Sequence, residues 1–479
     1  MKQLIVTEKP KSAHQVALAL ADKKPTKKVQ GGVTYYELVH KGKEIMVAST
    51  IGHIFGLAEK NKKGWRYPVF EVEWKPINEI QKGNNGPKKY VNALKHLAKE
   101  ADSIVIATDY DIEGEVIGLN VVRFAAKKKD AERMKYSTLT KPDLIEAYEN
   151  RQPTLDWGQA NAGETRHILD WYWGINLSRA LTTAVKTTGG FKLLSSGRVQ
   201  GPALKIIVDK EKEIKAFIAE PYWEVQLTLD SDGNIFTAEH EHGRFLNRKE
   251  AETAHNNAQS KTARVISISR TEFKQQPPHP FDLTSLQIEA YKTTRISPKE
   301  TLAIAQDLYT SGYISYPRTS SQQLPPAIGF KRIISDLSTQ TIFSALCKKL
   351  LEKELKPNNG KKTDPAHPAI FPTGIEPKKL EGKKERIYEL IVRRFLSTFA
   401  EPATRENATI KLQANKEPFV AVGITTTQKG WHEYYGHFLK LKELELPKLR
   451  EGQDVKINSI DLFDKETQPP RRYTEASII

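Results

Sequence analysis

The chain has 479 residues, and its 74 lysines and arginines exceed its 58 aspartates and glutamates, giving a formal net charge of +16. This length exceeds one ordinary domain, and the positive charge indicates a polyanionic partner, most plausibly nucleic acid. A merely basic, soluble surface is the competing interpretation, because net charge reports on association and not on chemistry. A single cysteine, Cys347, excludes an intrachain disulfide and a CxxC zinc ribbon. The sequence has no apolar run of the roughly 18 residues that a membrane span requires, so we expect a cytoplasmic protein.

Residues 1–155 alternate between strand and helix patterns. Short apolar runs at 3–7 and 103–107 are typical of buried strands, and each is followed by a stretch with helical spacing. A third run at 134–140 precedes another helical stretch. This alternation predicts a parallel sheet with covering helices.

Four further segments follow in chain order. Residues 156–215 have helical spacing, and 216–278 alternate apolar and polar residues around turn signals, as strands do. Helical spacing returns at 279–404, and alternation resumes at 405–465 before a short final segment, 466–479. The pattern predicts a β-rich domain interrupted by a helical insertion. Because two chain crossings join the insertion to its base, they could serve as a hinge.

The clearest chemical signal is an acidic cluster in the stretch ATDYDIEGE. Asp109, Asp111 and Glu113 are spaced by two, so in an extended chain they would face one side, directly beyond a predicted parallel strand. Carboxylates that crowd together favour a hard divalent cation, and oxygen-only ligation suits Mg²⁺. The alternative is a solvated acidic loop. The position between a strand and a helix expected from Gly114 favours the metal site.

Glu8 ends the first predicted strand, as the acidic cluster ends another. Ligands of open α/β sheets gather at such strand ends. If the two strands are neighbours, Glu8 faces the carboxylates, and crowding by like charges could raise its pKa and fit it for proton transfer. In isolation, Glu8 and the adjacent Lys9 would be an ordinary surface ion pair.

The stretch GYISYPRT places a phenol on a stiff segment. A capping box with proline at its first turn, Ser297–Glu300, starts a helix that Gly312 ends. Pro317 biases Tyr316 towards an extended conformation, with Arg318 on the same side. A phenol with a pKa of about 10 needs nearby cations to act as a nucleophile at neutral pH. Taken alone, such a tyrosine is more often a packing residue.

Two other stretches carry polar groups suited to phosphates. SSGRVQGPAL sets Ser195, Arg198 and Gln200 around Gly197, a turn suited to a phosphate backbone. His367 lies between two prolines, where a rigid imidazole could hydrogen-bond a phosphate oxygen. A lone histidine is usually structural, so His367 is a candidate only because other possible phosphate-binding residues occur in the same sequence.

Seven motifs occur in an order that resembles the type IA DNA topoisomerases, above all the archaeal and topoisomerase III-like branch. They are LIVTEKP, ATDYDIEGE, SSGRVQGPAL, PFDLTSLQ, YISYPRTSSQQLP, AHPAIFPT and RYTEAS, and they span nearly the whole chain. The resemblance implies a multidomain α/β, α and β protein. Its parts would be a Rossmann-like TOPRIM domain (1–155), part of a helical DNA-binding domain (156–215), a β-rich hinge domain (216–278 and 405–465), a helical gate domain carrying the nucleophile (279–404) and the start of a return to the DNA-binding domain (466–479), arranged as a toroidal body.

The resemblance also implies residue roles. Tyr316 would cut one DNA strand and hold its 5′ phosphate, with Arg318, Lys9 and His367 stabilising charge and Glu8 moving a proton. Mg²⁺ would be the cofactor, with Asp109, Asp111, Glu113 and Glu8 as ligands. The strand upstream of the cut would be held by Arg166, Asp170, Ser195, Arg198 and Gln200. Since transesterification stores the bond energy, no nucleotide is needed, and no GxxxxGK[ST] loop occurs.

One departure from the family is expected to matter. The sequence stops at YTEASII, where relatives continue with a segment that completes the body. We therefore expect a truncated chain, or one half of a split enzyme with a second polypeptide, and a helicase is a further possible partner. Two alternatives stay open: a TOPRIM nuclease or primase that does not need Tyr316, and a non-catalytic DNA-binding subunit.

Overall fold

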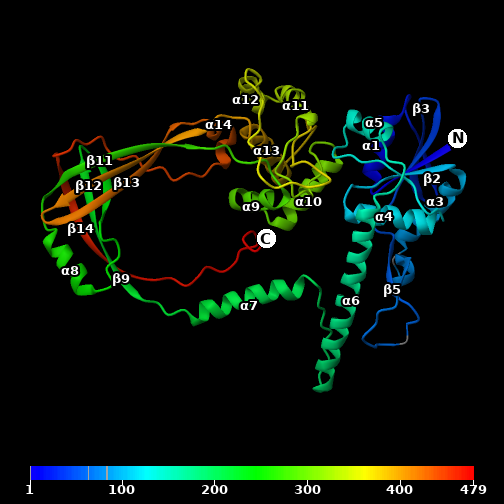
Figure 1. The fold of residues 1–479 in the computed structure, drawn as a ribbon, viewed down its shortest axis with the longest axis horizontal. Coiled ribbons are helices and arrows are strands. Elements are labelled where there is room, and N and C mark those ends of the chain that lie inside the picture. Colours follow the sequence, from blue (N-terminus) through cyan, green and yellow to red (C-terminus); the bar gives the residue numbers. More distant parts are fainter. Residues whose placement is uncertain (1, 63, 82, 84) are drawn as a thin grey trace.

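The computed structural model describes residues 2–62, 64–81, 83 and 85–479. Figure 1 shows an α/β unit at the N-terminus, two long helices leading away from it, a β-barrel, and a helical unit that returns to the α/β unit. The chain thus follows a ring-like course, in which the helical unit lies against the N-terminal α/β unit. Among the described helices, none combines the length and apolar character needed to cross a membrane.

The N-terminal unit is built on a mixed sheet with strand order β2-β3-β4-β1-β7-β8. β1 (Lys2–Thr7) lies between β4 (Lys43–Ser49) and β7 (Ser103–Ala107), parallel to both. The predicted parallel order therefore holds at the centre. β2 (Thr26–Gln30) and β3 (Val33–His40) are antiparallel additions, joined through Gly31 and Gly32, whose positive φ angles of 57° and 82° suit glycine.

The strand expected at 134–140 was wrong. β8 is only Glu132–Arg133, and the chain leaves the sheet after Met134, whose amide still donates to the Ile106 carbonyl oxygen at 2.9 Å. The backbone of this segment is used elsewhere, since the Ser137 carbonyl accepts a hydrogen bond from the Tyr316 amide at 2.8 Å. Contact with the helical unit thus replaces sheet pairing.

Helices cover both faces of this sheet because alternate residues of β1 are apolar on both sides. Ile5 packs with α1 (Pro10–Leu20) and α5 (Lys141–Glu149), whereas Leu4 and Val6 pack with α3 (Gly86–Glu100). The unit is completed by β5 (Phe55–Glu59), β6 (Val72–Pro76), α2 (Ile77–Ile80), α4 (Ile112–Asn120) and the π-helical turn η1 (Val121–Ala125).

Two long helices lead away from the sheet, α6 (Trp157–Thr187) and α7 (Gln200–Ala216). α6 crosses α4 closely at Gly163, where a Cβ atom would lie 2.5 Å from both the Ile112 carbonyl oxygen and Val116 Cγ2. Farther along, α6 exposes Leu169, Trp173 and other apolar side chains. Over its described range α7 has no buried residue.

The β-rich unit is a closed barrel with strand order β10-β13-β12-β11-β14-β9. Its strands are β9 (Pro221–Ser231), β10 (Asn234–His240), β11 (Thr262–Gln275), β12 (Ala403–Ala414), β13 (Glu417–Gln428) and β14 (Asp454–Glu466), with α8 (Arg248–Asn257) beside them. The end of β11 pairs with the start of β12, Gln275 opposite Ala403. The helical insertion, residues 276–402, therefore leaves and re-enters the barrel at one place.

The insertion contains α9 (Leu283–Thr294), α10 (Pro298–Thr310), η2 (Pro326–Ile328), α11 (Phe330–Leu337), α12 (Thr341–Leu351) and α13 (Gly382–Ser397). Ser297 caps α10 through the Glu300 amide, but the Glu300 carboxylate pairs with Lys383, so only half of the predicted capping box forms. Two short elements from outside the insertion also belong to its core. They are α14 (Trp431–Tyr435) and η3 (Gly436–Phe438), which follow β13 in sequence and pack on α13. The sequence pattern did not indicate this return.

Candidate active site

Tyr316 lies at the contact between the helical insertion and the N-terminal unit. Its side chain is 2% exposed, and its hydroxyl donates a hydrogen bond to Asp111 Oδ2 at 2.5 Å. The ring packs against His367 at 4.6 Å and against Tyr309 at 5.1 Å between centroids. A phenol and an acidic loop that are 205 residues apart in sequence thus meet directly.

The acidic loop follows β7, but its three carboxylates do not face one side as the spacing of two predicted. Asp111 Oδ1 accepts the Gly114 amide at 2.7 Å and caps α4, which begins at Ile112 and not at Gly114. Since the chain turns into a helix at Asp111, Glu113 lies in the first turn of that helix and contacts His53 and His167, whereas Asp109 and Asp111 contact Tyr309 and Tyr316. Gly114 permits the turn, because a Cβ there would lie 2.0 Å from the Asp109 carbonyl oxygen.

Asp109 is the most buried of these carboxylates, 3% exposed. Its Oδ1 accepts the Tyr309 hydroxyl at 3.2 Å, and Lys9 Nζ lies 3.7 Å from its Oδ2 and 3.2 Å from Glu8 Oε1. Burial, with the negative charge of Glu8 as a second cause, raises the pKa of Asp109 to about 7. Glu8 therefore does come to the acidic cluster, with Lys9 between the two carboxylates.

Glu113 is held by two histidines that sequence reasoning missed. Nε2 of His53 and Nε2 of His167 each lie 2.9 Å from Glu113 Oε2. Hydrogen bonds from His167 and then His53 hold the pKa of Glu113 far below its usual range. Each is a lone histidine without a surrounding motif, and only the fold brings them to one carboxylate.

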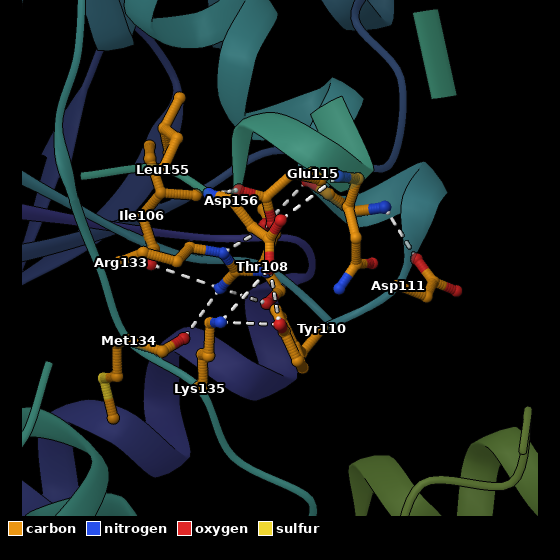
Figure 2. A network of polar contacts seen from close by, with 12 residues as sticks. Ile106, Thr108, Tyr110, Asp111, Glu115, Arg133, Met134, Lys135, Leu155 and Asp156 are labelled. Carbon is orange, nitrogen blue, oxygen red and sulfur yellow. Dashed lines mark hydrogen bonds and ion pairs between the residues drawn. The ribbon is translucent and has the colours of Figure 1, made fainter. Parts of the chain in front are cut away.

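A buried ion pair fixes the backbone of the acidic loop. Arg133 is fully buried and donates from Nε to Glu115 Oε2 at 2.7 Å, a contact drawn as a dashed line in Figure 2. Its other nitrogens donate to the carbonyl oxygens of Thr108 and Asp109, both at 3.0 Å. Because every arm of the guanidinium binds main chain or carboxylate, the loop that carries Asp109 and Asp111 has one defined course.

Other predicted residues are partly assembled. His367 is buried, with Nδ1 2.9 Å from Ser137 Oγ and Nε2 2.8 Å from the Tyr110 carbonyl oxygen. Since a carbonyl only accepts, Nε2 carries a proton, and burial lowers the pKa of this histidine. Arg318 is exposed and makes no hydrogen bond or ion pair with any described residue, so it is not drawn to the phenol as expected.

The residues predicted to hold a DNA strand lie along and beside α6. Arg166 connects two carboxylates, with NH1 3.6 Å from Glu113 Oε1 and Nε 3.8 Å from Asp170 Oδ2. Arg198 joins the row from the loop before α7, with Nε 2.6 Å from Asp170 Oδ1. Ser195 and Gln200 are exposed nearby in sequence, and their side chains make no hydrogen bond with any described residue.

The chemistry of Asp109, Asp111 and Glu8 fits a hard cation. In this arrangement the carboxylate oxygens of the three do not all lie within 4.8 Å of one another. Glu8 and Asp109 share Lys9 as their near positive charge, and the burial that raises the pKa of Asp109 is the condition that a divalent cation would relieve. Asp111 would gain a free oxygen when Tyr316 leaves it. The fit therefore improves once the phenol has moved.

Comparison with known proteins agrees with this fold and site. Residues 154–479 match the family described as DNA topoisomerase, and residues 3–139 match the Toprim domain, a metal-binding fold. A DNA topoisomerase 1 of Pyrococcus horikoshii is 44% identical over 99% of this chain and 70% of its own length. A DNA topoisomerase 1 of Methanocaldococcus jannaschii is 45% identical over 100% of this chain and 62% of its own length.

The fold agrees as well. The structure of full-length topoisomerase I from Thermotoga maritima superposes with a TM-score of 0.74 at 28% identity, covering 99% of this chain and 74% of that one. The chain belongs to the type IA DNA topoisomerase family, and the predicted TOPRIM-containing fold class is confirmed. It spans 62–70% of the length of the two archaeal relatives named above.

Proposed function

We propose that this chain breaks and rejoins one strand of DNA through Tyr316, without a nucleotide cofactor. The observation that carries the proposal is the 2.5 Å contact between the Tyr316 hydroxyl and Asp111 at the meeting of two units. In the forward step the phenolic oxygen bonds to phosphorus, the bond from phosphorus to the 3′ oxygen breaks, and a 5′-phosphotyrosine forms. The tyrosine's proton passes to a carboxylate, and the 3′ oxygen gains one. Rejoining is the reverse.

In the arrangement described, which we call closed, the insertion lies against the N-terminal unit and the Tyr316 phenol is not activated for attack. Burial, and then the charges of Asp111 and Asp109, raise the pKa of Tyr316 far above its ordinary value, so the phenol stays neutral. Asp111 is the nearest proton acceptor, and Glu8 adds negative charge behind it. Entry of a phosphate would separate Tyr316 from Asp111, and the exposed Arg318 is free to pair with that phosphate.

Asp109, Asp111 and Glu8 are the proposed ligands of Mg²⁺, which would supply positive charge at the scissile phosphate. Glu113 is the fourth ligand that the sequence predicts, but in this arrangement it binds His53 and His167 and would have to leave them to reach that cation. Lys9 balances Glu8 and Asp109 in the meantime. His367, already against the Tyr316 ring, keeps that ring in position.

The five sequence-derived domains are part of the same proposal. The row of Arg166, Asp170 and Arg198 on α6 and the loop before α7, with Ser195 and Gln200, would hold the strand upstream of the cut. The insertion, carrying Tyr316 and tethered only through the barrel, would swing to open a gap for a second strand. We place this activity in the cytoplasm, on the nucleoid, with a helicase or a second polypeptide as further proposed partners.

Replacing Tyr316 by phenylalanine tests the proposal. We expect Tyr316→Phe to bind single-stranded DNA as before, while the covalent protein–DNA adduct and plasmid relaxation fall on the order of 10³-fold or more. Tyr313→Phe, in the same segment, is the matched control and should retain both. The measurements are denaturing electrophoresis with end-labelled DNA and relaxation of supercoiled plasmid in Mg²⁺.

The competing functions give different results. Cleavage without an adduct, unchanged in Tyr316→Phe, would establish the nuclease instead. Strand binding with neither cleavage nor relaxation, even with a complementing polypeptide, would establish a non-catalytic subunit.

A further inference from the structure

We propose that His53, Glu113 and His167 form a second cation site, one that selects a zinc-class transition-metal ion over Mg²⁺. Among the described residues this is the one set of three or more His, Cys, Asp and Glu side chains whose ligand atoms all lie within 4.8 Å of one another. It goes beyond the proposed strand-passage activity, which needs only a hard cation at oxygen ligands.

The three side chains converge on one point. Nε2 of each histidine lies 2.9 Å from the same Glu113 oxygen, Oε2. The two imidazole rings are 4.8 Å apart between centroids and inclined by 58°, so they approach that oxygen from different directions. An ion placed among them would be reached by two nitrogens and one oxygen through small side-chain movements.

Three separate elements hold these ligands. Glu113 lies in the first turn of α4, and His167 lies on α6 one turn after Gly163, where the two helices are closest. His53 follows β4 in a loop that is tied to the end of β1, since the Gly52 amide donates to the Glu8 carbonyl oxygen at 3.2 Å. The ligand set is therefore preorganised by the fold and not carried on one mobile loop.

The donor set decides which ion it prefers. Imidazole nitrogen with one carboxylate suits zinc and neighbouring transition metals, whereas Mg²⁺ takes oxygen ligands and retains its waters. The side chains of His53, Glu113 and His167 are 28%, 35% and 27% exposed, which leaves room for a water as a fourth ligand. Trp74, with its ring 5.6 Å from that of His167, provides an apolar wall.

The alternative to a metal site is a hydrogen-bonded cluster in which the two histidines only neutralise Glu113. That interpretation accounts for the contacts, but it gives no preference among metals. The two interpretations therefore differ in a property that can be measured without DNA and without catalysis.

The test is a calorimetric titration of metal-stripped, untagged protein with Zn²⁺ in excess Mg²⁺. We expect one zinc per chain, with affinity reduced by at least about tenfold in His53→Asn and in His167→Asn. The control is His96→Asn, which removes an exposed histidine that also pairs with a glutamate, Glu100, at 3.0 Å. Tyr316→Phe should bind zinc like the unaltered protein, so failure of the nucleophile assignment would leave this result unchanged.

A second measurement needs no variant. Anomalous diffraction at the zinc edge from crystals grown with Zn²⁺ and Mg²⁺ should place the ion between the two histidines. The proposal is overturned if the unaltered protein binds no zinc in excess Mg²⁺, if both histidine variants bind it equally well, or if the anomalous peak lies elsewhere.

Discussion

Ionisation of Asp109 is unfavourable in this structure, and its position at the proposed metal site explains why such a residue is there. The carboxyl is almost completely buried, and its near cation, Lys9, is 3.7 Å away. Burial and the charge of Glu8 raise its pKa to about 7, so near neutral pH the fold resists ionising it. A bound cation would reverse this preference. The residue is thus poorly suited to the metal-free protein and well suited to a metal-bound one.

Asp109→Asn should stabilise the metal-free protein more at neutral than at acidic pH. The folded pKa of about 7 lies above the unfolded value of about 3.9, so the folded state binds the proton more tightly, and the contribution of Asp109 to stability is lost as pH rises from about 4 to 7. Asparagine does not ionise. Denaturant unfolding in chelator at pH 4 and pH 8 should show an advantage that grows with pH, at most a few kcal/mol.

The control for that experiment is Asp232→Asn, at an exposed hairpin position with φ of 53° that asparagine tolerates. It should show the same difference from the unaltered protein at both pH values. If Asp109→Asn also showed a pH-independent difference, the raised pKa would be refuted.

Local pattern predicted some of these side chains and not others. Tyr316, Glu8 and the acidic loop were found because each lies beside a strand end, a cap or a proline that leaves a trace in the sequence. His53 and His167 leave no such trace, since they lie 60 and 54 residues from the carboxylate they contact. The direction of Glu113 was mispredicted because a spacing of two was assumed to persist where Asp111 begins a helix.

The close crossing of α4 and α6 fixes the position of the first long helix relative to the N-terminal unit. Gly163 lets the two backbones approach, and the same approach brings His167 over Glu113. The periodicity of apolar residues predicted both helices, but it does not encode which small residue marks their contact. The position of the crossing therefore depends on how the two helices pack together, and neither helical sequence predicts it alone.

Gly163→Ala should destabilise the protein by about 1–3 kcal/mol, because its Cβ would lie 2.5 Å from the Ile112 carbonyl oxygen and must displace a helix. Gly174→Ala on the same helix is the matched control. Its nearest atom would be 3.8 Å away, and alanine favours helix by up to about 1 kcal/mol. Thermal or denaturant unfolding should move the two variants in opposite directions, and a stable Gly163→Ala protein would contradict the close crossing.

The insertion is docked on the N-terminal unit by polar contacts around Tyr316 and by a shared apolar cluster. The Tyr316 and Tyr309 hydroxyls, the Tyr316 amide and both nitrogens of His367 bind groups of the N-terminal unit. An exposed ion pair also crosses the boundary, with Lys11 Nζ 2.8 Å from Asp307 Oδ1. Exposed pairs contribute little, about 0.2–1 kcal/mol each. These contacts hold the arrangement in which Tyr316 reaches Asp111, and the proposed strand passage would have to break them.

Lys11→Gln should shift the protein towards the open arrangement by less than about fivefold, because it removes one exposed boundary pair and leaves Asp307 paired with Lys384 inside the insertion. The shift should fade at high salt, because screening already weakens this pair in the unaltered protein. Energy transfer between dyes on the insertion and on the N-terminal unit would measure it. Glu300→Gln is the control, since Glu300 pairs with Lys383 inside the insertion at 2.9 Å; an equal effect there would exclude a role for the boundary pair.

The pairing of Gln275 with Ala403 has a consequence for how this architecture could arise and be taken apart. The two chain ends that bear the insertion are already neighbours in a β-ladder, so a two-residue turn would close them. The β11–β12 pair would then be an ordinary hairpin, and the helical insertion stands where its turn would be. Excising residues 276–402 would leave the pairing of the six strands intact, but it would uncover Trp431, Tyr434, Tyr435 and Phe438, which pack in the core of the insertion. A self-sufficient barrel therefore requires that α14 and η3 be removed as well.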